Sequence, residues 1–216
     1  LGKEILSLKN DILAPSRELM DINDYHSCFD YISKQKPDII IHAAAFTSPP
    51  KCDKNPRLAR RTNVVGTLNI LEICEQFGIK MIYLSTDYVF DGDNGPYKTS
   101  DAINPINTYA ITKASGELLV KTYQNSLIIR TSFCEKQFPY EKAFEDQYTS
   151  RDYVDIIAPK ILNCSLSDKK GIVHIGTERK TVLDLARKRR PNVGTIKRSQ
   201  VNFNVPRDTS FEETYE

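Results

Sequence analysis

A tyrosine and a lysine placed four positions apart, Tyr109 and Lys113, are the strongest candidates for chemistry in this sequence. On a helix, residues at positions i and i+4 lie on one face, so the lysine ammonium can approach the tyrosine phenol. A positive charge beside a phenol stabilises the phenolate and lowers the pKa of the tyrosine from its usual value of about 10. We therefore predict that Tyr109 acts as a proton donor.

A threonine, Thr86, adds a second polar group at the end of the apolar run Lys80–Ser85. Open α/β sheets bind ligands at the carboxyl ends of their strands, so the Thr86 hydroxyl can hold a substrate carbonyl oxygen beside Tyr109. The alternative is a surface helix with an incidental tyrosine and lysine. The position of Thr86 after a strand, with Tyr109 on the following helix, favours the catalytic interpretation.

These side chains need a sheet and helices to hold them, and the sequence alternates between the two. Short runs rich in β-branched residues alternate with longer segments in which apolar residues recur every three or four positions, which is typical of βαβ units and a parallel sheet. The expected strands are Asp11–Ala14, Asp38–His42, Lys80–Ser85 and Ser126–Arg130, and the expected helices are Asp24–Gln35, Pro56–Phe77 and Pro105–Tyr123. We predict a doubly wound parallel α/β fold.

Beyond Arg130 the alternation becomes less regular. We expect a helix at Tyr153–Ser165, a strand at Gly171–Ile175 and a helix at Val182–Arg190. The chain is therefore predicted to have a main domain at residues 1–133 and a small α/β lobe at residues 134–216, with one helix returning to the main sheet. The polar tail Asn202–Glu216 is expected to be ordered by contact with this lobe.

The composition of the 216-residue chain limits the classes of function. A formal net charge of +2 does not attract a phosphate backbone through the bulk field, so we expect no nucleic-acid partner. No apolar run approaches the roughly 18–20 residues that cross a bilayer, so no membrane span is expected. Five scattered cysteines without a C-x-x-C pair indicate a reducing cytoplasm and no metal site. No export signal is visible at the start.

Four stretches resemble the dTDP-4-dehydrorhamnose reductase family of extended short-chain dehydrogenase/reductases. They are, in chain order, Ala43-Ala44-Ala45, Ser85–Gly92, Asn107–Lys113 and Arg130-Thr131-Ser132. The resemblance covers most of residues 1–133. It implies a Rossmann-like sheet and an NADPH-dependent oxidoreductase in which Thr86, Tyr109 and Lys113 catalyse hydride transfer to a 4-keto sugar nucleotide.

The resemblance also implies where the cofactor binds. A glycine-rich loop follows the first strand of such sheets and holds the pyrophosphate, and this chain matches only its last glycine, Gly2, whose role is close helix packing. We therefore expect the sheet to lack its first strand. Ser16 and Arg17 follow the second strand, where an arginine suits a ribose 2′-phosphate and favours NADP over NAD. Further cofactor contacts are implied for Asp21, Ile22, Ala43, Ala44, Ala45, Asn63, Ser85, Tyr109 and Lys113.

Substrate contacts are implied for Thr86, Asp87, Tyr88 and Arg207. Asp87-Tyr88 stand where sugar-nucleotide dehydratases carry Asp-Glu, which disfavours dehydration. Arg207 lies in a segment that resembles the family's Arg-Pro-x-x-Ser element, and its guanidinium can pair with a phosphate; a solvent-exposed arginine is an equal alternative. Cys134 and His174 do not match the Cys-His pair of epimerising relatives, and we expect both to be packing residues.

We therefore expect a cytoplasmic sugar-nucleotide reductase, as in dTDP-rhamnose biosynthesis, with a nucleotide sugar as its partner. The alternatives are a non-catalytic NADP-binding subunit like the methionine adenosyltransferase beta subunit, another sugar-nucleotide epimerase or reductase, and a fragment without independent function. The joint presence of Thr86, Tyr109 and Lys113 favours the enzyme. The sequence identifies neither the sugar nor the nucleotide, and it leaves open whether the chain forms a homodimer.

Overall fold

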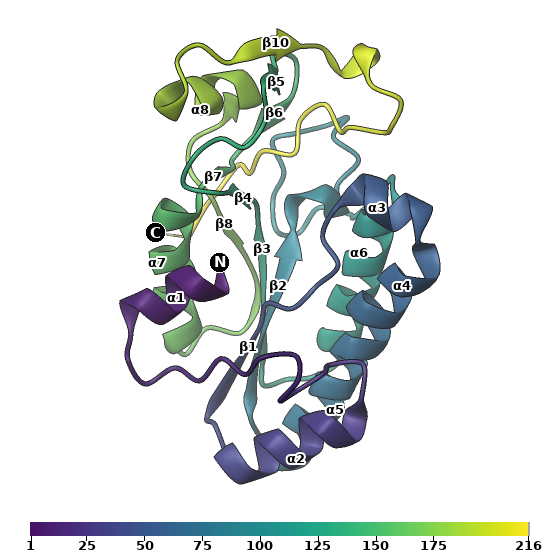
Figure 1. The fold of residues 1–216 in the computed structure, drawn as a ribbon, viewed down its shortest axis with the longest axis vertical. Helices are drawn as coiled ribbons and strands as arrows, with labels where there is room; N and C mark the ends of the chain where they lie inside the picture. Colours follow the sequence, from purple (N-terminus) through teal and green to yellow (C-terminus); the bar gives the residue numbers. More distant parts are fainter. Residues whose placement is uncertain (216) are drawn as a thin grey trace.

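A four-stranded parallel sheet forms the centre of the molecule, and the computed structural model describes it and its surroundings for residues 1–215 (Figure 1). The strands follow the order β1-β2-β3-β8, and every neighbouring pair is parallel. Their bounds are β1 (Ile39–His42), β2 (Lys80–Thr86), β3 (Ser126–Thr131) and β8 (Gly171–Ile175). Parallel strands need long crossover connections, which helices supply here. The predicted doubly wound parallel α/β fold is confirmed.

Helices cover both faces of the sheet, which explains why its central strands are almost continuously apolar. Met81 and Tyr83 of β2 pack into one apolar cluster, and Ile82 and Leu84 pack into another on the opposite face. In Figure 1, α1 and α7 lie on one side of the sheet, and α3, α4 and α6 lie on the other. The helices are α1 (Gly2–Leu8), α2 (Tyr25–Gln35), α3 (Pro49–Lys54), α4 (Pro56–Arg60), α5 (Gly66–Phe77), α6 (Thr108–Val120) and α7 (Val154–Leu166).

Capping side chains fix where two of the expected helices begin. The Asp24 carboxylate accepts a hydrogen bond from the His26 amide at 3.0 Å and starts α2. Asn107 accepts from the Ala110 amide at 2.9 Å, so α6 begins at Thr108 and not at the expected Pro105. The expected helix 56–77 is present as α4, a π-helical turn η1 (Arg61–Val65) and α5.

The expected strand Asp11–Ala14 is wrong. The structure has no strand in this segment. Within residues 1–215, β1 is at the edge of the sheet and is hydrogen-bonded only to β2. A β-strand forms only where its backbone can hydrogen-bond to a neighbouring strand. A run of only four residues does not indicate from sequence whether such a neighbour is present. Ile12 of this segment still packs against the apolar cluster beneath α1 and α7.

The C-terminal part adds short elements that the sequence did not predict. Three two-stranded sheets form around the helix α8, which begins with a Thr181–Asp184 capping box. Their bounds are β4 (Phe133–Cys134) with β7 (Asp152–Tyr153), β5 (Lys142–Phe144) with β10 (Gly194–Ile196), and β6 (Tyr148–Thr149) with β9 (Lys180–Thr181), and α8 spans Val182–Arg189. The division at residue 133 stays a prediction. Both α7 and β8 return to the main sheet, where one helix was expected.

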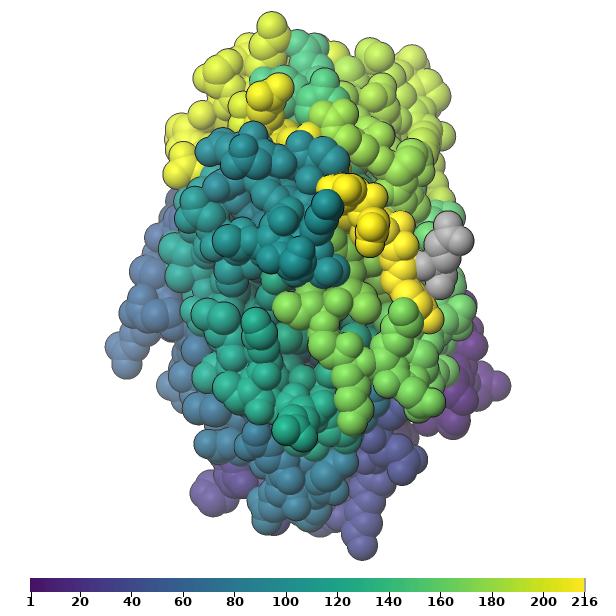
Figure 2. All heavy atoms as spheres, turned by 180° about the vertical axis from the view of Figure 1, so that it is seen from behind, coloured from purple at the N-terminus to yellow at the C-terminus, as the bar shows by residue number. Residues whose placement is uncertain are grey.

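The C-terminal tail is held by both parts of the molecule. Asp208 forms a bridge with Tyr148, and Phe211 forms a bridge with Tyr97 near the main sheet. Figure 2 shows this yellow segment lying along the surface between segments coloured teal and green. The expected contact with the lobe is therefore only part of its docking. Glu216, the end of the predicted tail, lies outside the described residues.

Within residues 1–215, no helix combines the length and the apolar character needed to cross a bilayer. The same part of the chain contains no cluster of three or more His, Cys, Asp or Glu side chains arranged to hold a metal ion. All five cysteines lie in it as free thiols.

Candidate active site

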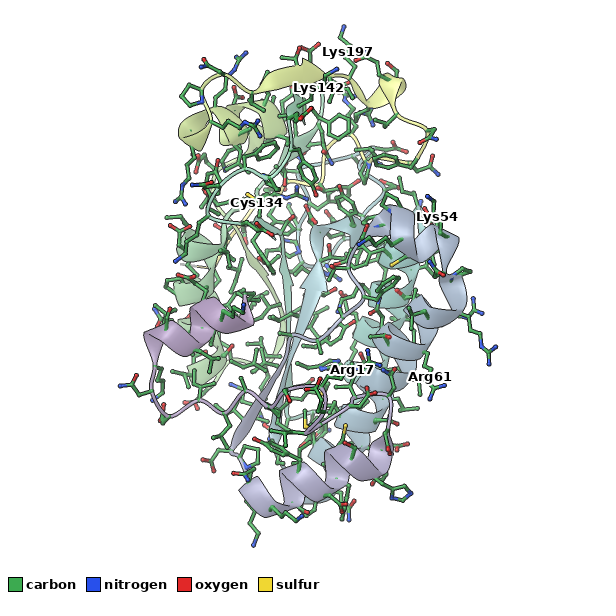
Figure 3. All side chains as sticks on the ribbon, viewed as in Figure 1. Arg17, Lys54, Arg61, Cys134, Lys142 and Lys197 are labelled. Atoms are coloured by element: carbon green, nitrogen blue, oxygen red, sulfur yellow. The ribbon has the colours of Figure 1, made fainter. Side chains whose placement is uncertain are left out.

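A cleft of about 1070 Å³ lies at the carboxyl ends of β1, β2 and β3. Ala43 and Ala45 line it after β1, Ser85 and Thr86 at the end of β2, and Ser132 after β3. The lobe forms the opposite wall. Figure 3 labels two residues of that wall, Cys134 and Lys142. This is the edge of an open parallel sheet at which ligands bind.

Thr86, Tyr109 and Lys113 all line this cleft. The turn that follows β2, the 3-10 helix η2 (Asp87–Val89), holds Thr86: its hydroxyl accepts from the Tyr88 amide at 3.2 Å and donates to Asp87 Oδ1 at 3.1 Å. Tyr109 and Lys113 come from the first two turns of α6. The structure therefore brings the three predicted catalytic residues together, although their roles stay predictions.

Burial dominates the electrostatics of this group. Lys113 is buried, its ammonium lies 4.1 Å from the centroid of the Tyr83 ring, and burial lowers its pKa to about 7 against the opposing charge of Glu117. Burial also raises the pKa of Tyr109, and the nearby Thr86 hydroxyl opposes this rise. The expected lowering of the Tyr109 pKa by Lys113 is wrong, because desolvation of the phenolate is the larger effect. Tyr109 consequently keeps its proton at neutral pH.

A buried ion pair joins α6 to β3. Arg130 of β3 and Glu117 of α6 are each 3% exposed, and Arg130 Nη2 lies 2.5 Å from Glu117 Oε1. The Ser85 hydroxyl donates to Glu117 Oε2 at 2.8 Å. Ser85 lines the cleft, and the contact expected between it and the cofactor stays a prediction. Each charge is compensated, and the pair fixes α6 against β2 and β3.

Asn63 connects the loop after β1 to α6 by hydrogen bonds. Its carboxamide accepts from the Phe46 amide at 2.7 Å and donates to the Phe46 carbonyl at 3.0 Å. The same nitrogen donates to Thr112 Oγ1 on α6 at 2.9 Å. Asn63 is 1% exposed and is not among the residues that line the cleft. It supports the site indirectly, and a direct cofactor contact is not supported by this geometry.

The small residues expected on the cofactor side are only partly at the cleft. Gly2, Ala43 and Ala45 line it, whereas Ala44 is not among the lining residues. A Cβ added to Gly2 would have no atom of residues 1–215 within 4 Å. The close packing that the resemblance implies for this glycine stays a prediction. The small side chains leave room for a flat ligand against the ends of the strands, which fits a dinucleotide.

The remaining expected cofactor residues lie outside the cleft walls. Arg17 is exposed and pairs with Asp21 at 3.2 Å, and Ile22 packs against Gly66 in the core beneath α5. Ser16 is likewise not among the lining residues. Figure 3 shows Arg17 well separated from Cys134 and Lys142 of the cleft. Contacts from these four residues to a cofactor stay predictions.

On the substrate side, Asp87 and Tyr88 line the cleft but Arg207 does not. Arg207 is exposed, which matches the alternative given for it. The lobe contributes two polar residues that were not among the predicted site residues. Gln147 donates to the Tyr88 hydroxyl at 3.2 Å, and Arg151 Nε donates to the Ser132 hydroxyl at 2.8 Å. Both line the cleft, and the short strands around them carry no periodic signal.

Cys134 and His174 behave differently from each other. Cys134 lines the cleft, and burial raises the pKa of its thiol to about 11. His174 is 2% exposed and stacks on Phe211 with 4.1 Å between ring centroids, as expected of a packing residue.

Comparison with protein families gives one match over most of the chain. The family described as "RmlD substrate binding domain" matches residues 1–164. The dTDP-4-dehydrorhamnose reductase of Aggregatibacter actinomycetemcomitans is 33% identical over 170 residues, which are 74% of this chain and 58% of that protein. Methionine adenosyltransferase 2 subunit beta of Bos taurus is 36% identical over 106 residues, or 49% of this chain and 32% of that protein. The chain spans about half the length of the curated relatives it matches.

Solved structures with the same architecture cover nearly the whole chain. The dTDP-4-dehydrorhamnose reductase of Bacillus anthracis, solved in complex with NADP, has a TM-score of 0.90 and 26% identity, and the match covers 98% of this chain and 86% of that one. A hypothetical dTDP-4-dehydrorhamnose reductase from Sulfolobus tokodaii has a TM-score of 0.85 and 28% identity, with 98% and 88% covered.

Proposed function

Because this chain belongs to the RmlD substrate-binding-domain family, we propose that its cleft catalyses the NADPH-dependent reduction of a 4-keto sugar nucleotide. The observation that carries the proposal is the convergence of Thr86, Tyr109 and Lys113 on one cleft at the carboxyl ends of the strands. The reductase relatives named above support the reaction class.

The three side chains divide the work of a carbonyl reduction. The substrate oxygen lies between the Thr86 hydroxyl and the Tyr109 phenol, and NADPH supplies a hydride to the carbonyl carbon when it is bound. Tyr109 gives its proton to the oxygen, which yields the alcohol and a tyrosinate. The Lys113 ammonium stabilises this tyrosinate until solvent restores the proton. With its pKa lowered to about 7 by burial, Lys113 can itself exchange a proton near neutral pH.

The cofactor side of the cleft suits NADP in shape. Gly2, Ala43 and Ala45 would lie against the dinucleotide, and Tyr109 and Lys113 would lie near its nicotinamide end. The NADP complex of the Bacillus anthracis relative supports NADP as the cofactor, and Arg17 is the residue proposed to select it over NAD.

A second candidate is a non-catalytic NADP-binding subunit. The observation that favours it is the 36% identity to methionine adenosyltransferase 2 subunit beta over 106 residues. Under this proposal the same cleft binds NADP but turns over no sugar nucleotide.

One assay separates the candidates. NADPH oxidation is followed with a panel of 4-keto sugar nucleotides, for this chain and for a version extended by an apolar strand ending in G-x-x-G ahead of Leu1, each with its Tyr109→Phe variant. Turnover that depends on Tyr109 supports the reductase. NADPH binding without turnover for any substrate overturns the reductase and favours the binding subunit, and the absence of binding by the extended version overturns both.

A further inference from the structure

The C-terminal segment reaches the catalytic end of β2 through a single side chain. Thr209 is completely buried, and its hydroxyl donates to Asp87 Oδ2 at 2.8 Å. The other oxygen of the same carboxylate, Oδ1, accepts from the Thr86 hydroxyl at 3.1 Å. One carboxylate therefore joins Thr86 to a residue more than 120 positions away in the sequence.

We propose that Thr209 is a positioning residue for Thr86 and that it acts through Asp87. The proposal rests on the proposed function, in which the Thr86 hydroxyl contacts the substrate oxygen. It assigns Asp87 a role different from the direct substrate contact that the resemblance implied. Asp87 is 2% exposed, and its carboxylate oxygens accept from hydroxyls of the chain itself.

Among the described residues, the hydrogen bond from Thr209 is the shortest that this carboxylate accepts. Oδ2 also accepts a long hydrogen bond from the Thr149 hydroxyl, at 3.4 Å, and the Ser132 hydroxyl stabilises the carboxylate as well. Burial raises the pKa of Asp87, and the charge of Arg151 and the hydrogen bond from Thr209 oppose this. A buried charged acceptor that loses its short hydrogen bond must rotate towards another donor or take up a proton. Either change alters the hydrogen bond between Asp87 and Thr86.

When Asp87 is held in place, the Thr86 hydroxyl can form few further hydrogen bonds. A threonine hydroxyl has one hydrogen and two acceptor positions. The hydrogen points to Asp87, and one acceptor position receives the Tyr88 amide at 3.2 Å. In this arrangement only an acceptor position remains, so Thr86 can donate to a substrate oxygen only when its hydrogen leaves Asp87. The orientation of Asp87 therefore decides what Thr86 presents to the cleft.

The segment that carries Thr209 is clamped on both sides, which makes its position precise. The Thr209 amide donates to the Tyr148 carbonyl at 3.1 Å, and the Asp208 amide donates to the Gly92 carbonyl at 3.1 Å. Gly92 has a φ of +88°, and a Cβ there would lie 2.6 Å from the Arg207 nitrogen, so only glycine permits this approach. The next residue, Ser210, is also fully buried, but its hydroxyl donates to Asp208 Oδ1 and not to Asp87.

Three variants test the proposal by kinetics in the extended version of the chain. Thr209→Val keeps the shape and removes the hydroxyl, Thr209→Ser keeps the hydroxyl, and Ser210→Ala is the matched control. We expect Thr209→Val to lower kcat by roughly 10- to 100-fold, the loss typical of a hydrogen bond to a charged group. KM and the Kd of NADPH should change little, Thr209→Ser should restore most of kcat, and Ser210→Ala should stay within about threefold. A Thr209→Val enzyme with unchanged kcat would overturn the proposal.

A second measurement remains informative if no substrate turns over, and it separates this proposal from the proposed function. In a double-mutant cycle, urea unfolding is measured for Thr209→Val, Thr86→Val and the double variant. Because the coupling must pass through Asp87, we expect the unfolding constants to deviate from additivity by roughly twofold or more. The parallel cycle with Ser210→Ala should be additive. Additivity in both cycles would show that Thr209 does not act on Thr86.

Discussion

The buried imidazole of His174 should make this protein less stable on acidification. The ring is 2% exposed, stacks on Phe211 and contacts the Phe90 ring edge-on at 5.8 Å between centroids. Neither ring nitrogen has a hydrogen-bond partner within residues 1–215. Burial lowers the pKa of His174 from 6.5 to about 3, and the charge of Arg130 adds to the effect while Asp101 opposes it.

The sign and size of the effect follow from the difference between the folded and unfolded pKa values. Between pH 6.5 and about 3, the unfolded chain binds a proton at His174 that the folded chain refuses. Stability is therefore fully present above pH 6.5 and is lost as the pH falls through this window. At about pH 5 the difference is roughly 1.5 pH units, which at about 1.36 kcal/mol per unit amounts to ~2 kcal/mol.

The assay compares the unmutated protein with His174→Phe, which keeps an aromatic ring against Phe211 but cannot titrate. Free energies of urea unfolding are measured at about pH 8 and about pH 5 for both proteins. His42, whose pKa is also lowered to about 3 by burial and by the charge of Lys113, contributes equally to both and cancels. We expect the unmutated protein to lose ~2 kcal/mol more than the variant. Equal losses of unfolding free energy in the two proteins would refute the assignment of this pH dependence to His174.

Three further changes have expected outcomes. Tyr109→Phe should abolish ketone reduction and leave the Kd of NADPH nearly unchanged, because it removes the proton donor and little packing. Steady-state kinetics and a fluorescence titration with NADPH measure the two effects. Turnover retained within a few-fold would reject Tyr109 as the acid. The extended version should bind NADPH more tightly than NADH, and Arg17→Ala should remove the preference; equal affinities before mutation would exclude Arg17 as the selecting residue. Gly116→Ala should lower the free energy of unfolding by about 1–3 kcal/mol, because the added Cβ meets the Tyr83 hydroxyl. An unchanged midpoint of urea unfolding would contradict this close approach of α6 to β2.

The part of the cleft that brings Thr86, Tyr109 and Lys113 together was predictable from sequence because local signals define it. The apolar run that becomes β2 ends at Thr86, and the cap at Asn107 with the spacing of Tyr109 and Lys113 defines the start and one face of α6. These signals need no knowledge of distant residues. The electrostatics did not follow from spacing, because the pKa of Tyr109 depends on how deeply the cleft residues are buried, and only the packed structure shows that.

The other half of the site depends on contacts between distant segments, which the sequence does not show. The segment of Arg207 was singled out because a guanidinium suits a phosphate, and a substrate contact by Arg207 stays a prediction. Arg207 is exposed, and Thr209, two positions later, reaches Asp87. An extended segment exposes alternate side chains, so its buried face is set by what it docks against. Here that partner is assembled from the turn after β2 and the short strand β6, which lie far apart in the chain. No local pattern encodes such a contact, and for that reason the proposed role of the Thr209 hydroxyl in orienting Thr86 could be inferred only from the packed structure.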